Sequence, residues 1–125
     1  MEKTDEYFKF RSVIKKLQKA AATSGDLVQE AYKGEHPLAG FCYIMCEALY
    51  HLFPHRRLAP HRMNVGETPH WFLIDQLMHI VDPTADQFPE PLEYDKDKIV
   101  SCGFLTKHPS KRCVELIQRA GLQLK

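Results

Sequence analysis

The first part of the chain carries apolar side chains at the spacing of a helix. They recur every three or four positions, which places them on one face of a 3.6-residue repeat. These residues are Phe8, Val13, Ile14, Leu17, Ala20 and Ala21. We therefore predict an amphipathic helix over residues 4–22, and a second short helix over residues 27–32 between Asp26, which can cap it, and Gly34.

Two further helices are indicated later in the chain. Residues 41–53 are apolar almost all round a helical wheel, and a helix of that composition is usually buried. We predict a core helix there, with Cys42 near its start and Pro54 closing it. A last helix is predicted over residues 109–121, because proline suits a first helical position and glycine a helix end.

Strand patterns lie between these helices. An irregular strand is predicted over residues 57–67, a hairpin over 70–82 and a further strand over 98–102. A chain of 125 residues is long enough for one modest core, and we expect a single domain over 1–125. The fold class expected is α+β, with a central buried helix packed on a small antiparallel sheet and flanked by N- and C-terminal helices.

The hairpin over residues 70–82 gives a specific expected pairing. With a three-residue turn at 75–77, Ile74 faces Met78 and His70 faces Asp82. Directly opposed residues hold their Cβ atoms about 4.5–5.5 Å apart on one face, so we expect a hydrogen bond between His70 and Asp82. Both faces of the hairpin are otherwise apolar, and we expect it to lie in the interior.

The composition limits the classes of function. Lys and Arg number 17 and Asp and Glu 16, for a formal net charge of +1, which gives no overall attraction to nucleic acid or to an anionic membrane. The N-terminal residues are of mixed charge, unlike a signal peptide, and no run approaches the roughly 20 apolar residues of a membrane span. We expect a cytoplasmic protein with four free thiols, whose partner is a protein or peptide.

Three residues follow one another as the chemistry of a cysteine nucleophile requires. A helix N-terminus and an adjacent imidazolium both stabilise a thiolate, so Cys42 is the expected nucleophile. His70 is the expected general base and acid, and Asp82 is expected to fix its tautomer. The backbone N–H of Cys42 is placed to donate to an oxyanion.

The same segments resemble the papain-like and transglutaminase-like cysteine enzyme superfamily, in particular its small bacterial and phage toxin-type members. The resemblance covers about residues 38–88. It rests on Gly-Phe-Cys at 40–42 opening a buried helix, His-Trp at 70–71 on a strand, and Ile-Val-Asp-Pro-Thr-Ala-Asp-Gln-Phe at 80–88. The resemblance implies that the cysteine, the histidine and the first aspartate form a catalytic triad on an α+β fold.

Four further residues are candidates for oxyanion or substrate binding. Papain-like peptidases place an oxyanion-hole glutamine six residues before the cysteine, where this chain has His36; either His36 donates instead or another group completes the hole. Phe41 and Trp71 adjoin the cysteine and the histidine, although Trp71 also fits a core position. Gln87 completes the candidates, but the Thr84–Gln87 spacing also fits a helix capping box.

The expected activity is that of a hydrolase or acyltransferase acting on an amide or peptide carbonyl through a thioester. Peptidase, isopeptidase and glutamine deamidase remain open, as does acyl transfer to an amine. The alternative is a non-catalytic protein-binding module on the same scaffold, which meets its partner through residues 56–62. We expect no cofactor and no metal, because Cys42, Cys46 and His51 share one helix and no second compact ligand pair follows.

Overall fold

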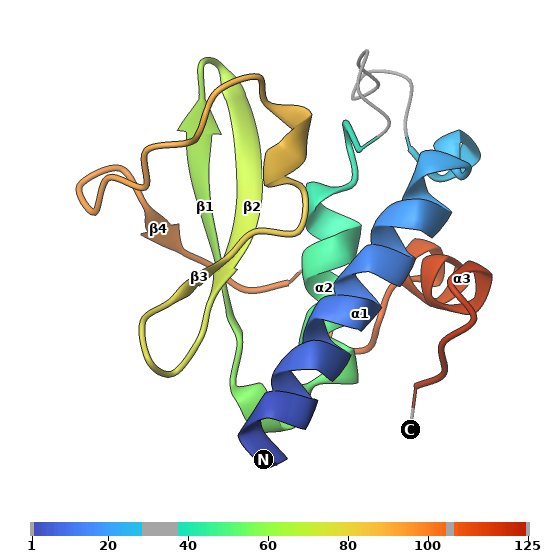
Figure 1. The fold of residues 1–125 in the computed structure, drawn as a ribbon. Helices are drawn as coiled ribbons and strands as arrows, with labels where there is room; N and C mark the ends of the chain where they lie inside the picture. The colour runs from blue at the N-terminus through green and yellow to red at the C-terminus, as the bar shows by residue number, and fades with distance from the viewer. Residues whose placement is uncertain (1, 29–37, 105–106, 125) are drawn as a thin grey trace.

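The computed structural model describes residues 2–28, 38–104 and 107–124, with side chains from residue 8 onwards. These residues form a small α+β fold in which helices lie beside an antiparallel sheet (Figure 1). The helices are α1 (Glu2–Ala22), α2 (Cys42–Leu52) and α3 (Lys111–Arg119). The sheet has the order β3-β2-β1-β4, with strands β1 (Ala59–Val65), β2 (Thr68–Ile74), β3 (Ile80–Val81) and β4 (Val100–Ser101).

The amphipathic helix predicted over residues 4–22 is confirmed as α1. Its buried face differs from the prediction at one position, because Phe8 is 63% exposed and Phe10 is buried in its place. Positions 10, 13, 17 and 20 follow one helical stripe, and position 8 lies on the opposite side of the helix. Each large apolar side chain that this stripe removes from water contributes about 1.5–3 kcal/mol of hydrophobic free energy.

The core helix predicted over residues 41–53 is confirmed as α2. Its middle is buried all round, from Ile44 to Leu49, because it contacts both β2 and α3. The chain enters α2 through a turn in which the Phe41 N–H donates to the Leu38 carbonyl. Gly40 has a φ of 84° in that turn, a conformation that glycine adopts without strain. The turn places Cys42 at the first helical position.

The hairpin forms, but its register differs from the prediction. The observed partners are Leu73 with Val81 and Ile74 with Ile80, so the direct pairing of His70 with Asp82 is wrong. Residues 75–79 now separate the two strands, and because the Asp75 N–H donates to the His79 carbonyl, the three-residue turn lies at 76–78 instead of 75–77. Because the loop moves by one residue, the pairing moves by two, and a shift of two keeps every side chain on its original face.

The expectation of an interior hairpin is correct for β2 only. Phe72 and Leu73 are fully buried, whereas Leu77, Met78 and Ile80 at the hairpin tip are 69%, 75% and 40% exposed. The tip lies away from the helices (Figure 1). Its apolar side chains therefore face solvent.

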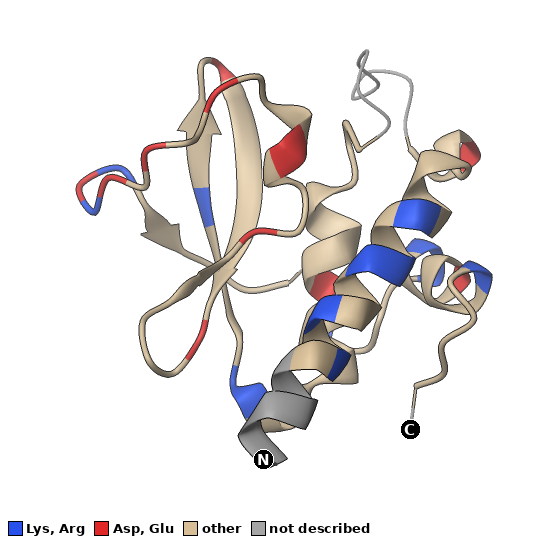
Figure 2. Ribbon diagram, in the orientation of Figure 1, with Lys and Arg blue, Asp and Glu red and all other residues tan. Residues whose placement is uncertain are grey.

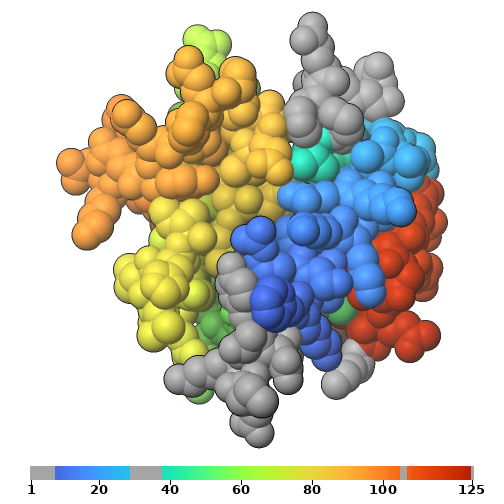
Figure 3. Space-filling model, in the orientation of Figure 1, coloured from blue at the N-terminus to red at the C-terminus, as the bar shows by residue number. Residues whose placement is uncertain are grey.

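An irregular segment, residues 83–99, connects β3 to β4 and crosses one face of the β1–β2 pair (Figure 1). Ring contacts fix it there: Phe88 meets His70 at 5.0 Å and Tyr94 meets Phe72 at 5.1 Å between centroids. The Gln18 side chain donates to the Pro83 carbonyl at 2.9 Å. The start of the segment is thus held against α1, and the two run beside each other on one face of the molecule (Figure 3).

Several smaller predictions have clear outcomes. Predicted strands 57–67 and 98–102 form as β1 and the shorter β4, and the helix predicted over 109–121 forms as α3 with Ser110 as its N-cap. Leu27 ends a 3-10 turn and Val28 is extended, and the remainder of the helix predicted over 27–32 lies outside the described residues. Within the described ranges, no helix combines the length and apolar character needed to cross a membrane.

Candidate active site

Cys42 differs in its surroundings from the other three cysteines. It is partly exposed at the first position of α2, and all four cysteines are free thiols. Burial raises the pKa of Cys46 and Cys113 well above the ordinary thiol value, and burial also raises that of the partly exposed Cys102. Cys42 is thus the thiol that combines access with a helix N-terminus, where the helix dipole favours a negative charge.

His70 lies next to Cys42 and is almost completely buried, with 1% of its surface exposed. Its ring stacks on Phe72 at 6.3 Å and meets the edge of Phe88 at 5.0 Å. Its Nε2 atom hydrogen-bonds to Oδ2 of Asp82 at 2.6 Å. The Cys42 side chain is the second polar neighbour of the imidazole and acts on its pKa through hydrogen bonding and charge.

The pKa of His70 reflects two opposing effects. Burial lowers it, because the charged ring loses its water. The hydrogen bonds to Asp82 and to Cys42, together with the negative charge of both partners, outweigh burial and raise the pKa to about 9. At neutral pH the imidazole is therefore held as an imidazolium between the thiol and the carboxylate.

Asp82 follows the last residue of β3 and receives three hydrogen bonds. Besides His70, the Tyr94 hydroxyl donates to Oδ2 at 2.6 Å and the Thr84 N–H donates to Oδ1 at 3.3 Å. The Asp82 side chain is only 4% exposed. A nearly buried carboxylate with three donors is satisfied by the protein itself. Sequence analysis named His70 for this carboxylate and missed Tyr94, whose segment has no periodic pattern.

The pairing of His70 with Asp82 survives the change of register because the two residues stay on one face. Asp82 lies opposite Phe72 when the observed pairing is extended by one residue, and His70 is the diagonal neighbour on that face. Diagonal Cβ atoms lie about 7–8 Å apart at most, within the combined reach of an imidazole and a carboxylate. The predicted contact thus forms through a different geometry.

The arrangement supports nucleophilic chemistry at a carbonyl. An imidazolium beside a thiol favours the thiolate. The N–H groups in the first turn of α2 have no acceptor within the helix and are available to a ligand at its N-terminus. The Cys42 N–H belongs to that first turn, so a carbonyl carbon held at the sulfur has a backbone donor close to its oxygen.

The other predicted site residues have different places. His36 lies outside the described residues. Phe41 is 1% exposed and belongs to the hydrophobic core, so its side chain packs instead of facing the site. Trp71 is half-buried, edge-on to Tyr43 at 4.8 Å and stacked on Phe104 at 6.0 Å, on the opposite face of β2 from His70.

Gln87 lies in a short 3-10 turn, Ala85–Gln87, and is partly exposed. The capping box predicted with Thr84 is wrong, because the Thr84 side chain makes no cap hydrogen bond and its hydroxyl is buried without a partner. The backbone N–H of Thr84 is directed to Asp82 instead. Over the part of the chain that the structure describes, no group of three His, Cys, Asp or Glu side chains is arranged to hold a metal.

Comparisons with known proteins found no matching family model, no similar curated protein and no similar solved structure. The function must therefore be inferred from the local chemistry of Cys42, His70 and Asp82.

Proposed function

We propose that this protein is a cysteine-nucleophile hydrolase or acyltransferase, of the papain-like and transglutaminase-like type, that acts on an amide or peptide carbonyl. One observation carries the proposal. A buried imidazole lies beside an accessible thiol at a helix N-terminus, which acts on its pKa, and its Nε2 is hydrogen-bonded to a carboxylate at 2.6 Å.

The reaction follows from the charges in this cluster. The Cys42 thiolate attacks the carbonyl carbon, a C–S bond forms, and the carbonyl electron pair moves to oxygen, beside the Cys42 N–H. His70 then gives its proton to the departing nitrogen as the C–N bond breaks, which leaves a thioester. Water or an amine attacks the thioester next, with neutral His70 taking its proton and the thiolate leaving.

Asp82 has a supporting part in this reaction. Its bond to Nε2 leaves Nδ1 as the ring nitrogen that exchanges a proton at the sulfur in the proposed reaction, and its negative charge stabilises the imidazolium. Peptide hydrolysis, isopeptide hydrolysis, glutamine deamidation and acyl transfer to an amine share these steps. They differ in which amide reaches Cys42 and in whether water or an amine attacks the thioester.

Selective alkylation tests the proposal without a known substrate. The full chain is treated with iodoacetamide at pH 6.5, and the labelling rate of each cysteine is read by peptide mass spectrometry. Cys42 should react at least about tenfold faster than Cys102, which is the matched control because it is also partly exposed. His70→Ala should remove that difference. Equal rates for the two thiols in the unmodified protein would contradict the proposal.

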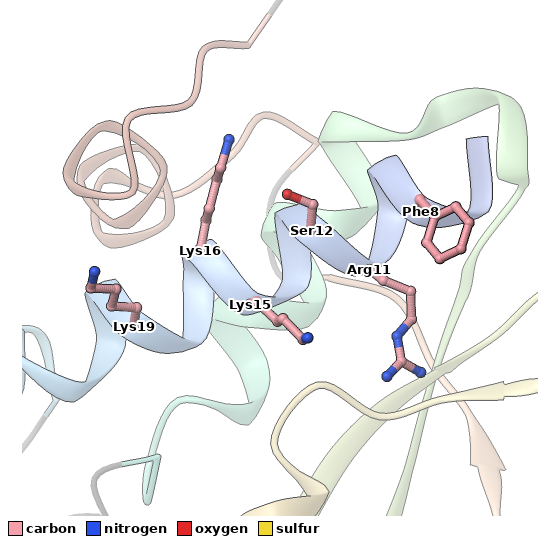
Figure 4. A pocket seen from close by; sticks show the side chains of 6 residues that line it. All are labelled: Phe8, Arg11, Ser12, Lys15, Lys16 and Lys19. Carbon is pink, nitrogen blue, oxygen red and sulfur yellow. The ribbon is translucent and has the colours of Figure 1, made fainter. Parts of the chain in front are cut away.

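The alternative is a non-catalytic module that binds an acidic segment of another protein. Lys and Arg gather on α1, whereas Asp and Glu are spread over the segment between β3 and β4 (Figure 2). A surface hollow of about 650 Å³ runs along α1 (Figure 4). Its lining residues are Phe8, Arg11, Ser12, Lys15, Lys16 and Lys19.

Residues 56–62, where a partner contact was expected, still present exposed cations at Arg57 and Arg62, whereas the Arg56 guanidinium lies over the Phe10 ring at 4.0 Å. An acidic partner complements the α1 cations. For a binding module, Cys42 and Cys102 should label slowly and equally, and Lys15→Glu combined with Lys19→Glu should abolish retention on an immobilised poly-glutamate peptide. Fast labelling of Cys42, together with retention that the two lysine substitutions leave unchanged, would exclude the binding module.

A further inference from the structure

We propose that Tyr94 is a positioning residue for His70: by donating to the Asp82 oxygen that also holds the imidazole, it keeps that imidazole able to give up its proton. This inference rests on the proposed function of the Cys42–His70–Asp82 cluster and assigns a part to a residue outside it. Tyr94 acts through Asp82 and contacts neither the thiol nor a reacting carbonyl.

The geometry shows two donors on one acceptor atom. Oδ2 of Asp82 accepts from His70 Nε2 and from the Tyr94 hydroxyl, both at 2.6 Å. Oδ1 receives only the longer bond from the Thr84 N–H, at 3.3 Å. Two short hydrogen bonds to one oxygen draw on the same negative charge. The charge that stabilises the imidazolium is therefore shared with the phenol.

The Tyr94 hydroxyl is held as a hydrogen-bond donor to Asp82. Its ring meets the edge of Phe72 at 5.1 Å, and Phe72 also stacks on His70, so one buried side chain supports both donors. Burial, the bond to Asp82 and the charge of Asp82 raise the pKa of Tyr94 beyond the ordinary phenol value. The hydroxyl keeps its proton throughout the working pH range and is neither a base nor a nucleophile.

The benefit lies in the two tasks of His70. The proposed reaction requires the imidazole to hold a proton beside the sulfur and then to release that proton to a leaving nitrogen. Asp82, after β3, and Cys42, on α2, are the titratable groups that act on the ring, while the neutral rings of Phe72 and Phe88 pack against it. An undivided Asp82 charge would bind the proton more tightly and make its release harder.

The test is a titration of the His70 ring by nuclear magnetic resonance in the full chain, with the signal assigned through His70→Gln. In the unmodified protein the midpoint should lie near pH 9. Tyr94→Phe keeps the ring packing and removes the donor, so the midpoint should rise by about half a pH unit or more, a roughly threefold gain in proton affinity. Tyr50→Phe, which removes a hydroxyl from an exposed side chain of α2, should leave it unchanged.

A second variant protects the test against misfolding of Tyr94→Phe. Replacing tyrosine by 3-fluorotyrosine throughout the chain makes the phenol a stronger donor, so the His70 midpoint should fall. An unchanged midpoint in both proteins, or a rise with fluorination, would overturn the role of Tyr94. Equal alkylation of Cys42 and Cys102 would instead remove the proposed function, and the titration would still report whether Tyr94 modulates His70.

Discussion

Glu47, in the middle of α2, and Ser110, the N-cap of α3, form a buried connection between the two helices. The Glu47 carboxylate accepts from the Ser110 N–H at 2.9 Å and from its hydroxyl at 2.6 Å, and Glu47 is completely buried. The Ser110 oxygen also accepts from the Cys113 N–H at 3.2 Å. A carboxylate at a helix N-terminus is stabilised by that end of the helix dipole. The pair fixes the helix that carries Cys42.

Loss of this connection should destabilise the fold. Ser110→Ala removes the side-chain cap, at about 1 kcal/mol, and leaves the buried carboxylate short of one donor, at about 1–3 kcal/mol more. We expect the free energy of unfolding, measured by urea denaturation at pH 7, to fall by about 2–4 kcal/mol. Ser12→Ala on the exposed face of α1 is the matched control and should change it by no more than about 0.5 kcal/mol. Equal effects of the two substitutions would contradict a structural role for the pair.

The sequence indicates that α2 is buried, but it does not reveal the partner of Glu47. A single glutamate in an apolar helix is usually placed toward solvent, and here the donor stands 63 residues later in the chain. Pro109 was expected at the first helical position, whereas Ser110 is the N-cap and α3 begins at Lys111. Which carboxylate meets that cap depends on how α2 and α3 pack, and no local pattern contains that information.

The register of the β2–β3 hairpin shows a similar limit. The loop length was predicted correctly, but Asp75 was placed inside the loop. In the structure its side chain accepts from the Leu77 and His79 N–H groups, both at 2.9 Å, and Met78 adopts a φ of 67°. Aspartate favours the first position of a type I turn for this reason, and that preference moves the loop by one residue.

Asp75 should therefore determine where the hairpin turns. Asp75→Ala removes both side-chain bonds to the loop and should lower the free energy of unfolding by about 1–2 kcal/mol. Asp75→Asn keeps an acceptor oxygen and should recover at least half of the loss. Because β3 leads directly into Asp82, Asp75→Ala should also slow the alkylation of Cys42. Denaturation and alkylation measured on the same samples check both effects, and an asparagine variant as unstable as the alanine variant would argue against the hydrogen bonds.

Asp82 itself gives the sharpest prediction for the site. Asp82→Asn keeps the shape of the side chain and removes its charge, so the pKa of His70 should fall from about 9, because burial then acts without its main counterweight. In a measurement at pH 7.5 the ring is then neutral. Alkylation of Cys42 by iodoacetamide at that pH should slow by about tenfold or more.

The matched control for Asp82→Asn lies four residues further on. Asp86 is exposed in the same irregular segment, and Asp86→Asn removes one carboxylate charge without touching the imidazole. It should leave the alkylation rate of Cys42 unchanged within about a factor of two, since exposed charges are screened by solvent. A similar loss of rate in both variants would mean that overall charge, and not the bond to His70, governs the thiol.

The raised pKa of His70 also predicts how stability depends on pH. The native ring titrates near 9 and the unfolded ring near its ordinary value of 6.5, so the folded state binds the proton more tightly. The stabilisation from this proton is complete below about pH 6.5, decreases above it, and is gone once the pH passes 9. The shift corresponds to at most about 3 kcal/mol.

We expect urea unfolding at pH 6, 8 and 10 to show this decline in the unmodified protein. In His70→Gln the decline should be smaller by about 2–3 kcal/mol, because the cysteines that ionise in the unfolded chain are common to both proteins. Parallel curves for the two proteins would show that His70 has no raised proton affinity in the folded state, and would remove the imidazolium on which the proposed activation of Cys42 depends.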